Sequence, residues 1–259
     1  MNRLTELFLR KKNNILSIYF TAGFPNLDDT NLILDELAGS GVDMIEIGIP
    51  FSDPLADGPV IQHSSEVALK NGMSVKLLFE QLRKSPIPNP QSPIPCLLMG
   101  YLNPVLQFGV ENFCKRASEV GISAVILPDL PMEEYLKDYK LIFDKYDLKN
   151  IFLITPQTPE KRIRHVDEHS DGFIYMVSSS STTGVKKGIS LEKEEYFYRI
   201  QEMKLKSPVM IGFGIGDKRS FSRACEYASG AIIGSAFINA ISLTESVGNS
   251  VREFIGSIK

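Results

Sequence analysis

The sequence predicts a (β/α)8 TIM barrel, with a single domain over residues 1–259 and a short N-terminal helix. Eight short β-type runs alternate with helical segments along the 259 residues. The second run contains a Glu and leads into a loop rich in proline, and glycine-bearing turns follow the last three runs. An open doubly wound sheet of this length would usually show fewer strands or a second domain.

The predicted strands are short apolar runs, at residues 15–20, 44–49, 94–99, 124–127, 150–154, 173–177, 209–212 and 230–234. The predicted helices between them mix charged residues with apolar residues at helical spacing. They cover residues 28–38, 74–84, 110–120, 133–145, 159–168, 191–203 and 218–227, and a closing helix covers 243–258. This order is the strand–helix alternation that a parallel barrel requires.

Two further segments bear on domain organisation. Leu4, Leu7 and Phe8 have helical spacing and predict a short amphipathic helix lying on the domain, not a secretory signal. The proline-rich stretch 85–95 could be a domain linker or a docking motif. We favour an extended helix-to-strand connection on the non-catalytic face, because a break there would leave only two strands before it.

Composition excludes several classes of function. The net charge of −3 and the pI near 5.7 provide no basic field for nucleic acid or an anionic membrane. Cys96, Cys114 and Cys225 are widely spaced and lie in apolar or helical stretches, which predicts buried thiols in a reducing, cytoplasmic compartment. No apolar run approaches the roughly 20 residues of a membrane span.

Two carboxylates form the main candidate for catalysis. Glu46 interrupts a buried strand, where a carboxylate is costly unless it serves a site or an ion pair. Asp57 follows in a loop that Pro50, Pro54 and Pro59 stiffen. We predict that Glu46 and Asp57 are an acid/base pair. A structural ion pair for Glu46 and an ordinary Asp-Gly turn for Asp57 remain the alternatives.

Glycine turns predict a phosphate site in the loops that follow the last three strands. They lie at 182–184, 212–216 and 234–235, after the sixth, seventh and eighth strands. Barrels often bind phosphate between the last two loops, through backbone N–H groups and the start of a short helix. The turn at 212–216 lacks the third glycine of a dinucleotide fingerprint, so a turn without a ligand is the alternative for that motif alone.

Other polar motifs carry weaker signals. His165 and His169 match an H-x-x-E-H zinc-protease pattern, but the charged residues around them favour a solvated helix end. We expect His63 to cap a helix or lie on the surface, and Asp129 to brace a loop. The serines at 178–181 are expected to form a loop and not to supply a nucleophile.

One long motif is highly specific. The segment IGIPFSDPLADGPVIQ at residues 47–62 strongly resembles the tryptophan synthase alpha subunit family. Shorter matches cover nearly the whole chain: YFTAGFP at 19–25, MGYLNP at 99–104, LPDLP at 127–131, TG at 183–184, GFGI at 212–215 and GS at 234–235. The segment 179–182 replaces the glycine-containing run that is more usual before Thr183 and Gly184. This departure bears on how the loop closes and not on the chemistry.

The resemblance implies reversible retro-aldol cleavage of indole-3-glycerol phosphate to indole and glyceraldehyde 3-phosphate. It matches Glu46 and Asp57 to the family's catalytic acids. It matches the phosphate site to Gly184, Phe213, Gly214, Gly234 and Ser235. Tyr175 matches a residue beside the catalytic Glu, and we expect apolar walls for the indole ring from Ile61, Leu98, Ile126 and Ile154.

The resemblance also implies a partner. A pyridoxal-phosphate-bearing beta subunit would use the indole, in an alpha2-beta2 tetramer, and this chain would need neither a metal nor an organic cofactor. We expect the contact surface in segments 50–59 and 101–104, including Asp53, Pro54, Asn103 and Pro104. The alternative is that these residues only brace the active-site loops.

Two rival functions stay open on sequence alone. Another phosphate-handling barrel enzyme would share the glycine turns but has no reason for the pair Glu46 and Asp57. A barrel retained mainly as a binding or activating subunit would have weak chemistry of its own.

Overall fold

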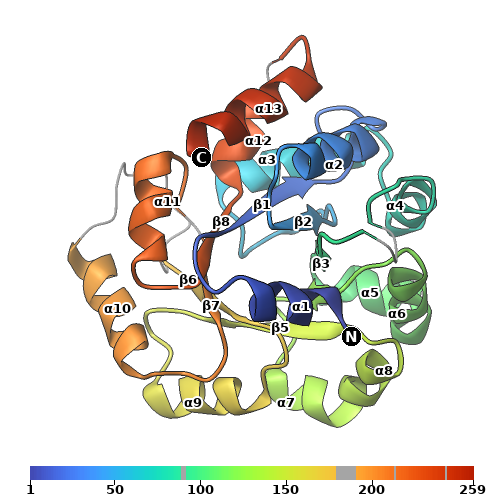
Figure 1. The fold of residues 1–259 in the computed structure, drawn as a ribbon. Helices are drawn as coiled ribbons and strands as arrows, with labels where there is room; N and C mark the ends of the chain where they lie inside the picture. Colours follow the sequence, from blue (N-terminus) through green and yellow to red (C-terminus); the bar gives the residue numbers. More distant parts are fainter. Residues whose placement is uncertain (89–91, 179–190, 213, 243) are drawn as a thin grey trace.

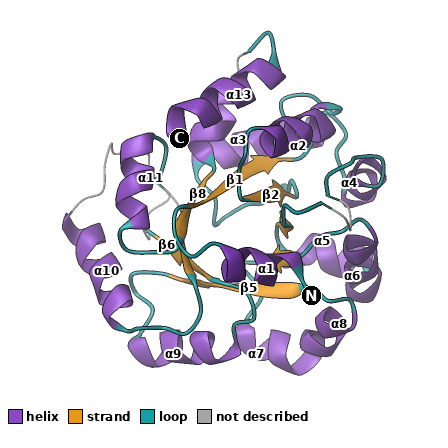
Figure 2. Cartoon of the chain, in the orientation of Figure 1, coloured by secondary structure: helices purple, strands orange, loops and turns teal. Residues whose placement is uncertain are grey.

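The computed structural model describes residues 1–88, 92–178, 191–212, 214–242 and 244–259. Its strands form a closed parallel barrel in sequence order, inside a ring of helices (Figures 1 and 2). The strands are β1 (Ile15–Thr21), β2 (Met44–Gly48), β3 (Cys96–Met99), β4 (Ala124–Ile126), β5 (Lys149–Ile154), β6 (Ile174–Val177), β7 (Val209–Gly212) and β8 (Gly230–Ile233). The predicted fold class is therefore confirmed.

The helices cover the outside of this barrel. They are α1 (Arg3–Arg10), α2 (Asp29–Gly39), α3 (Pro59–Lys70), α4 (Val75–Leu82), α5 (Leu102–Phe108), α6 (Val110–Glu119), α7 (Met132–Glu134), α8 (Lys140–Lys145), α9 (Glu160–His169), α10 (Leu191–Glu202), α11 (Lys218–Cys225), α12 (Ser235–Ser242) and α13 (Val247–Ile258). Helix α3 begins with Pro59, whose fixed φ suits the first helical position.

Two apolar cores result from the alternation of side chains along each strand. One lies between the strands and the surrounding helices and includes Ile45, Ile47 and Leu98. The other fills the barrel interior and includes Met44 and Leu97. The register Tyr19↔Glu46↔Leu97 places these three residues at one level on adjacent strands, so Glu46 points into the barrel.

Helix α1 closes one end of the barrel. Leu4, Leu7 and Phe8 belong to the interior core, and the Phe8 ring lies 5.8 Å from that of Phe173. Figure 1 shows α1 across the opening formed by the strands. The predicted amphipathic helix is confirmed, and it leaves the opposite end, where strands run into their following loops, for a site.

The structure differs from the predicted helices in several places, and α3 and α5 lie outside all of the predicted ranges. The helix expected over 133–145 is split into α7, a π-helical segment (Tyr135–Tyr139) and α8. The closing helix expected over 243–258 begins at Val247, and α12 precedes it. The described part of the proline-rich stretch connects α4 to β3 without regular structure, as predicted.

The cysteines differ in burial from the expectation. Cys96 and Cys114 are buried, and burial raises the pKa of each thiol to about 12. Cys225 is partly exposed, so the expectation of three buried thiols was wrong for it; its place at the end of α11 explains the exposure. In the described ranges, every helix is too short or too polar to span a bilayer.

Candidate active site

Strand β2 places the Glu46 carboxyl group inside the barrel. The side chain is 0% exposed, and Oε1 accepts a hydrogen bond of 2.8 Å from the Ser17 hydroxyl on β1. Within the described part of the chain, Oε2 is buried without a hydrogen-bond partner. Glu46 forms no salt bridge with any described residue, which argues against the structural ion pair. A buried polar atom without a partner is costly and often marks a functional position.

Burial gives Glu46 the proton affinity of a general acid. Desolvation raises its pKa to about 8, and the Ser17 hydrogen bond partly opposes this rise. Tyr19 and Tyr175 face the same space, since both lie in or against the interior core. Their pKa values are raised mainly by burial and further by the nearby carboxylates, so both phenols are neutral near pH 7.

Two glycines make room for these tyrosines. A Cβ at Gly48 would lie 2.2 Å from the Tyr19 hydroxyl oxygen, and one at Gly212 would lie 2.3 Å from that of Tyr175. Any other residue at either position would therefore displace a ring that stands beside Glu46.

The loop between β2 and α3 carries Asp57. Burial raises the pKa of Asp57 to about 6, while a hydrogen bond of 3.1 Å from the Tyr101 hydroxyl to Oδ2 lowers it. Gln62, in the first turns of α3, donates to the Asp57 carbonyl oxygen at 2.9 Å. The loop is thus held from both sides, which supports a site in preference to a plain turn.

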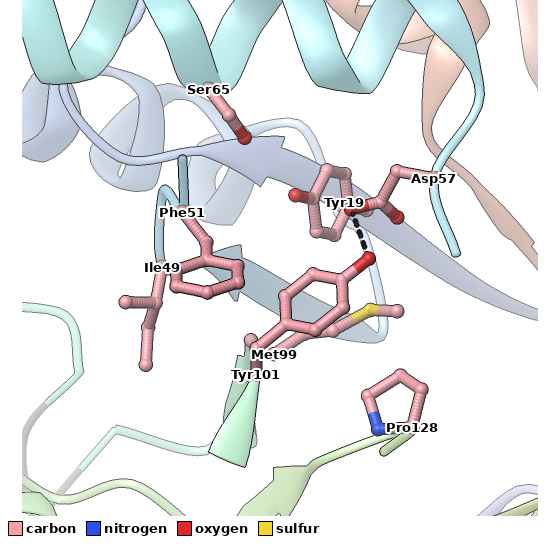
Figure 3. A pocket seen from close by; sticks show the side chains of 9 residues that line it. Tyr19, Ile49, Phe51, Asp57, Ser65, Met99, Tyr101 and Pro128 are labelled. Carbon is pink, nitrogen blue, oxygen red and sulfur yellow. Dashed lines mark hydrogen bonds between the residues drawn. The ribbon is translucent and has the colours of Figure 1, made fainter. Parts of the chain in front are cut away.

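A small pocket opens beside this loop, where β2, β3 and β4 end; Glu46 is not among the residues that line it. It is lined by Tyr19, Ile49, Phe51, Asp57, Ser65, Met99, Gly100, Tyr101 and Pro128. In Figure 3, Tyr101 and Asp57 point toward one another, and Phe51 lies beside the Tyr101 ring. The pocket therefore contains a carboxylate, phenols and apolar walls at the catalytic end of the barrel.

Two of the three predicted phosphate turns, those after β7 and β8, lie next to each other in the described part of the chain. These strands pair directly, and a Cβ at Gly216 would lie 3.0 Å from that of Ala236 in the first turn of α12. Ser235 begins α12, and Gly214 has a φ of +77°, which favours glycine. Gly234 lies against Tyr19, since an added Cβ would be 3.4 Å from Tyr19 Cδ1. Gly184 and Phe213 lie outside the described residues.

The predicted apolar walls need a correction. Ile126 and Tyr175 belong to the interior core, as the prediction required. Leu98 and Ile154, however, lie in the layer between strands and helices, and Ile61 lies there too, on α3. The inward side chains on the same strands are Leu97, Met99 and Leu153. The prediction for Leu98 and Ile154 was wrong because adjacent residues of a strand face opposite sides.

The loops expected to contact a partner lie next to each other. Asp53 and Asn103 are exposed, while Pro54 and Pro104 are partly exposed. Leu55, which follows Pro54 in the β2 loop, is 88% exposed. Tyr101 connects the two segments, because its hydroxyl also accepts a hydrogen bond of 3.0 Å from Ala56 N–H.

His63, Asp129 and the histidines of α9 take the places expected of them. His63 is exposed on α3, and Asp129 braces a loop by accepting two hydrogen bonds from Leu102 N–H. On α9, the possible ligand atoms of His165, Glu168 and His169 lie within 4.8 Å of one another. This face is partly exposed and carries nearby arginines, in agreement with a solvated helix. Ser178 is buried, and the serines at 179–181 lie outside the described residues.

Sequence reasoning missed the contribution of Ser17 and assigned no catalytic-site role to Tyr19 or Tyr101. Ser17 and Tyr19 alternate with Ile18 along β1, and this period of two was the available signal that both face inward. Tyr101 gave no such signal, because it follows the end of β3.

Comparisons with known proteins identify the family. The family model described as tryptophan synthase alpha chain matches residues 6–257. The tryptophan synthase alpha chain of Flavobacterium psychrophilum is 55% identical over 258 residues, and that of Parabacteroides distasonis is 50% identical over 259. Each alignment covers 100% of both chains.

Solved structures agree with these relatives. The crystal structure of tryptophan synthase alpha chain from Legionella pneumophila superposes with a TM-score of 0.86 at 32% identity, covering 100% of this chain and 96% of that one. A structure of tryptophan synthase from M. tuberculosis, in an aminoacrylate-bound form, superposes with a TM-score of 0.83 at 27% identity. The match covers 100% of this chain and 98% of that one. With a matching family model over nearly its full length and close relatives end to end, the chain belongs to the tryptophan synthase alpha chain family.

Proposed function

We propose that Glu46 and Asp57 carry out the cleavage of indole-3-glycerol phosphate, the lyase reaction of the family to which this protein belongs. The carbon–carbon bond breaks when indole C3 is protonated and the glycerol hydroxyl loses its proton, which yields indole and glyceraldehyde 3-phosphate. The observation that carries the assignment is the buried Glu46 carboxyl, whose second oxygen lacks a protein partner among the described residues.

Glu46 is suited to both proton transfers. With a pKa of about 8 it holds a proton near neutral pH and can give it to indole C3. The resulting carboxylate can then take the hydroxyl proton, which restores the acid for the next turnover.

Asp57 serves as the electrostatic partner. With a pKa of about 6 it is mostly ionised at pH 7, so it can accept a hydrogen bond from the indole N–H. Positive charge develops on the ring as C3 is protonated, and a fixed carboxylate stabilises that charge. The ring would then lie over the inward side chains Leu97, Met99, Ile126 and Leu153, near Tyr175.

We assign the phosphate to the turns after β6, β7 and β8, with Gly184, Phe213, Gly214, Gly234 and Ser235 around it. Convergence of the β7 loop on the first turn of α12 supports this assignment, because backbone N–H groups at a helix start favour an anion. Gly234 lies against Tyr19, which lines the pocket described above, so the phosphate would lie beside the place where the carbon–carbon bond breaks.

The wider setting follows from the same chemistry. Glu46 supplies the proton transfers and Asp57 stabilises the charge on the ring, so we propose that this chain needs no metal or organic cofactor and that pyridoxal phosphate belongs to a beta subunit. Chains of both kinds would form an alpha2-beta2 tetramer in the cytoplasm, and residues 1–259 of this one would form a single domain. The adjacent exposed loops with Asp53, Pro54, Asn103 and Pro104 are the proposed contact surface.

Cleavage of indole-3-glycerol phosphate by the purified chain, with and without a tryptophan synthase beta subunit from the same organism, tests these proposals. We expect indole release from the chain alone, complex formation, and faster release in the complex. Absence of indole release in both conditions would contradict the catalytic assignment. Release without complex formation or any rate change would contradict the partner surface, for which Leu55→Ser is a sharper probe, since Leu55 is exposed in the free chain.

A further inference from the structure

Tyr101 makes three contacts with the loop that carries Asp57. Its hydroxyl donates to Asp57 Oδ2 at 3.1 Å and accepts from Ala56 N–H at 3.0 Å. Its ring packs against Phe51, at the start of the same loop, with centroids 5.1 Å apart. Figure 3 shows the hydroxyl directed at the carboxylate. One side chain thus fixes the start of the loop, its backbone and its carboxylate.

Tyr101 is itself held by the next loop of the barrel. Leu102 N–H, in the residue that begins α5, donates to both carboxylate oxygens of Asp129, at 2.9 and 3.1 Å. Asp129 lies in the loop after β4, so hydrogen bonds join the loops of β2, β3 and β4 in series. A carboxylate at a helix start is also favoured by the helix dipole.

We propose that Tyr101 is a positioning residue that sets the place and ionisation of Asp57, and that Asp129 holds Tyr101 for this task. This inference rests on the role assigned to Asp57 under the proposed function. A donor to the ionised form stabilises the carboxylate, so Tyr101 opposes the effect of burial on Asp57.

The other titratable groups near Asp57 do not obscure the effect of Tyr101 on the pKa of Asp57. Tyr19 on β1 and Tyr175 on β6 interact with it, and both are neutral because their pKa values are raised well above the ordinary range. Glu46 on β2 interacts electrostatically with the same two tyrosines. Its pKa of about 8 is higher than that of Asp57, so the two carboxyl groups ionise in different pH ranges. A change at the acid side of a pH profile therefore reports Asp57.

The test compares Tyr101→Phe with Tyr198→Phe, which removes a phenol hydroxyl from an exposed side chain of α10. Tyr101→Phe keeps the ring against Phe51 and removes only the hydroxyl. We expect kcat/KM at pH 7 to fall about 10-fold, the scale of a lost hydrogen bond to a charged group. The acid limb of the profile should move to higher pH, and Tyr198→Phe should match the wild type. Asp129→Asn should shift the limb in the same direction by less, because Asn offers one acceptor oxygen.

A second readout does not depend on turnover. Carbon-13 NMR titration of Asp57 in the resting protein should give a higher pKa in Tyr101→Phe than in the wild type. An unchanged titration, or an equal loss of activity at every pH, would overturn the inference and leave Tyr101 a merely structural residue. If the wild type fails to cleave indole-3-glycerol phosphate, the proposed function fails, while the titration still decides whether Tyr101 controls Asp57.

Discussion

Replacing Glu46 with Gln should abolish cleavage and stabilise the fold at the same time. Gln keeps the shape and can accept the Ser17 hydrogen bond, but it cannot give or take a proton. Loss of a general acid/base lowers the rate by at least about 10²-fold. The variant should therefore fold and bind substrate but fail to turn it over.

The gain in stability follows from proton linkage. The pKa of Glu46 is about 8 in the fold, against an ordinary value of 4.5 in the unfolded chain. Between these values the native state binds more protons than the unfolded state, so stability falls as pH rises from 4.5 to about 8. At about 1.4 kcal/mol per pH unit, the cost is about 3 kcal/mol at pH 7 and about 5 kcal/mol above pH 8. Gln does not ionise, so it avoids this cost.

Two measurements check the reasoning. Single-turnover cleavage tests the chemistry, and urea unfolding at pH 5 and pH 8 tests the linkage. Glu46→Gln should gain stability over the wild type mainly at pH 8, whereas Glu253→Gln, at an exposed position of α13, should show no such dependence. Near wild-type turnover in Glu46→Gln would refute the catalytic role. Equal stability of the variant and the wild type at pH 8 would refute the raised pKa.

Further predictions concern the second carboxylate and the phosphate. The pH profile of kcat/KM should be bell-shaped, rising as Asp57 ionises near pH 6 and falling as Glu46 ionises near pH 8; a flat profile from pH 5 to 9 would argue against both roles. Asp57→Asn should lower kcat by a smaller factor than Glu46→Gln, as measured by indole release, because Asn keeps a hydrogen-bond acceptor but loses the charge. Gly214→Val should weaken binding of glyceraldehyde 3-phosphate at least about 10-fold and indole much less, as calorimetry can measure. Gly72→Val is the matched control, since Gly72 also has a positive φ, and equal weakening of indole by Gly214→Val would place the ring at these turns.

The sequence predicted the strand order of the barrel but not which face of each strand is inward. Glu46 marks the inward face of β2, since its carboxylate would not be buried against helices. On β3 the run Leu97–Leu98 carries no such mark, and the inward face follows only from the register Glu46↔Leu97. Register between parallel strands depends on the whole closed barrel, so it could not be read from one apolar run.

The residues of the candidate site could be proposed from the sequence where their chemistry leaves a local pattern. A carboxylate in a strand and prolines in a short loop indicated Glu46 and Asp57, and glycines indicated Gly214 and Gly234. Tyr101 was not predictable as a partner of Asp57, because the two are 44 residues apart and lie in different loops that meet only in the folded barrel. Contacts of that kind arise from the tertiary structure and produce no characteristic residue spacing in the sequence.

Helix α1 has a consequence for the order in which the chain folds. Its contacts lie far ahead in the sequence: Asn2 donates to the carbonyl oxygens of Ser123 and Asp147, and Phe8 packs against Phe173. A ribosome therefore makes α1 long before the strands that receive it, and the helix has nowhere to bury its apolar face until more than half of the barrel has been made. Seating α1 would then be a late event in folding, which seals the end of a barrel whose strands have already met.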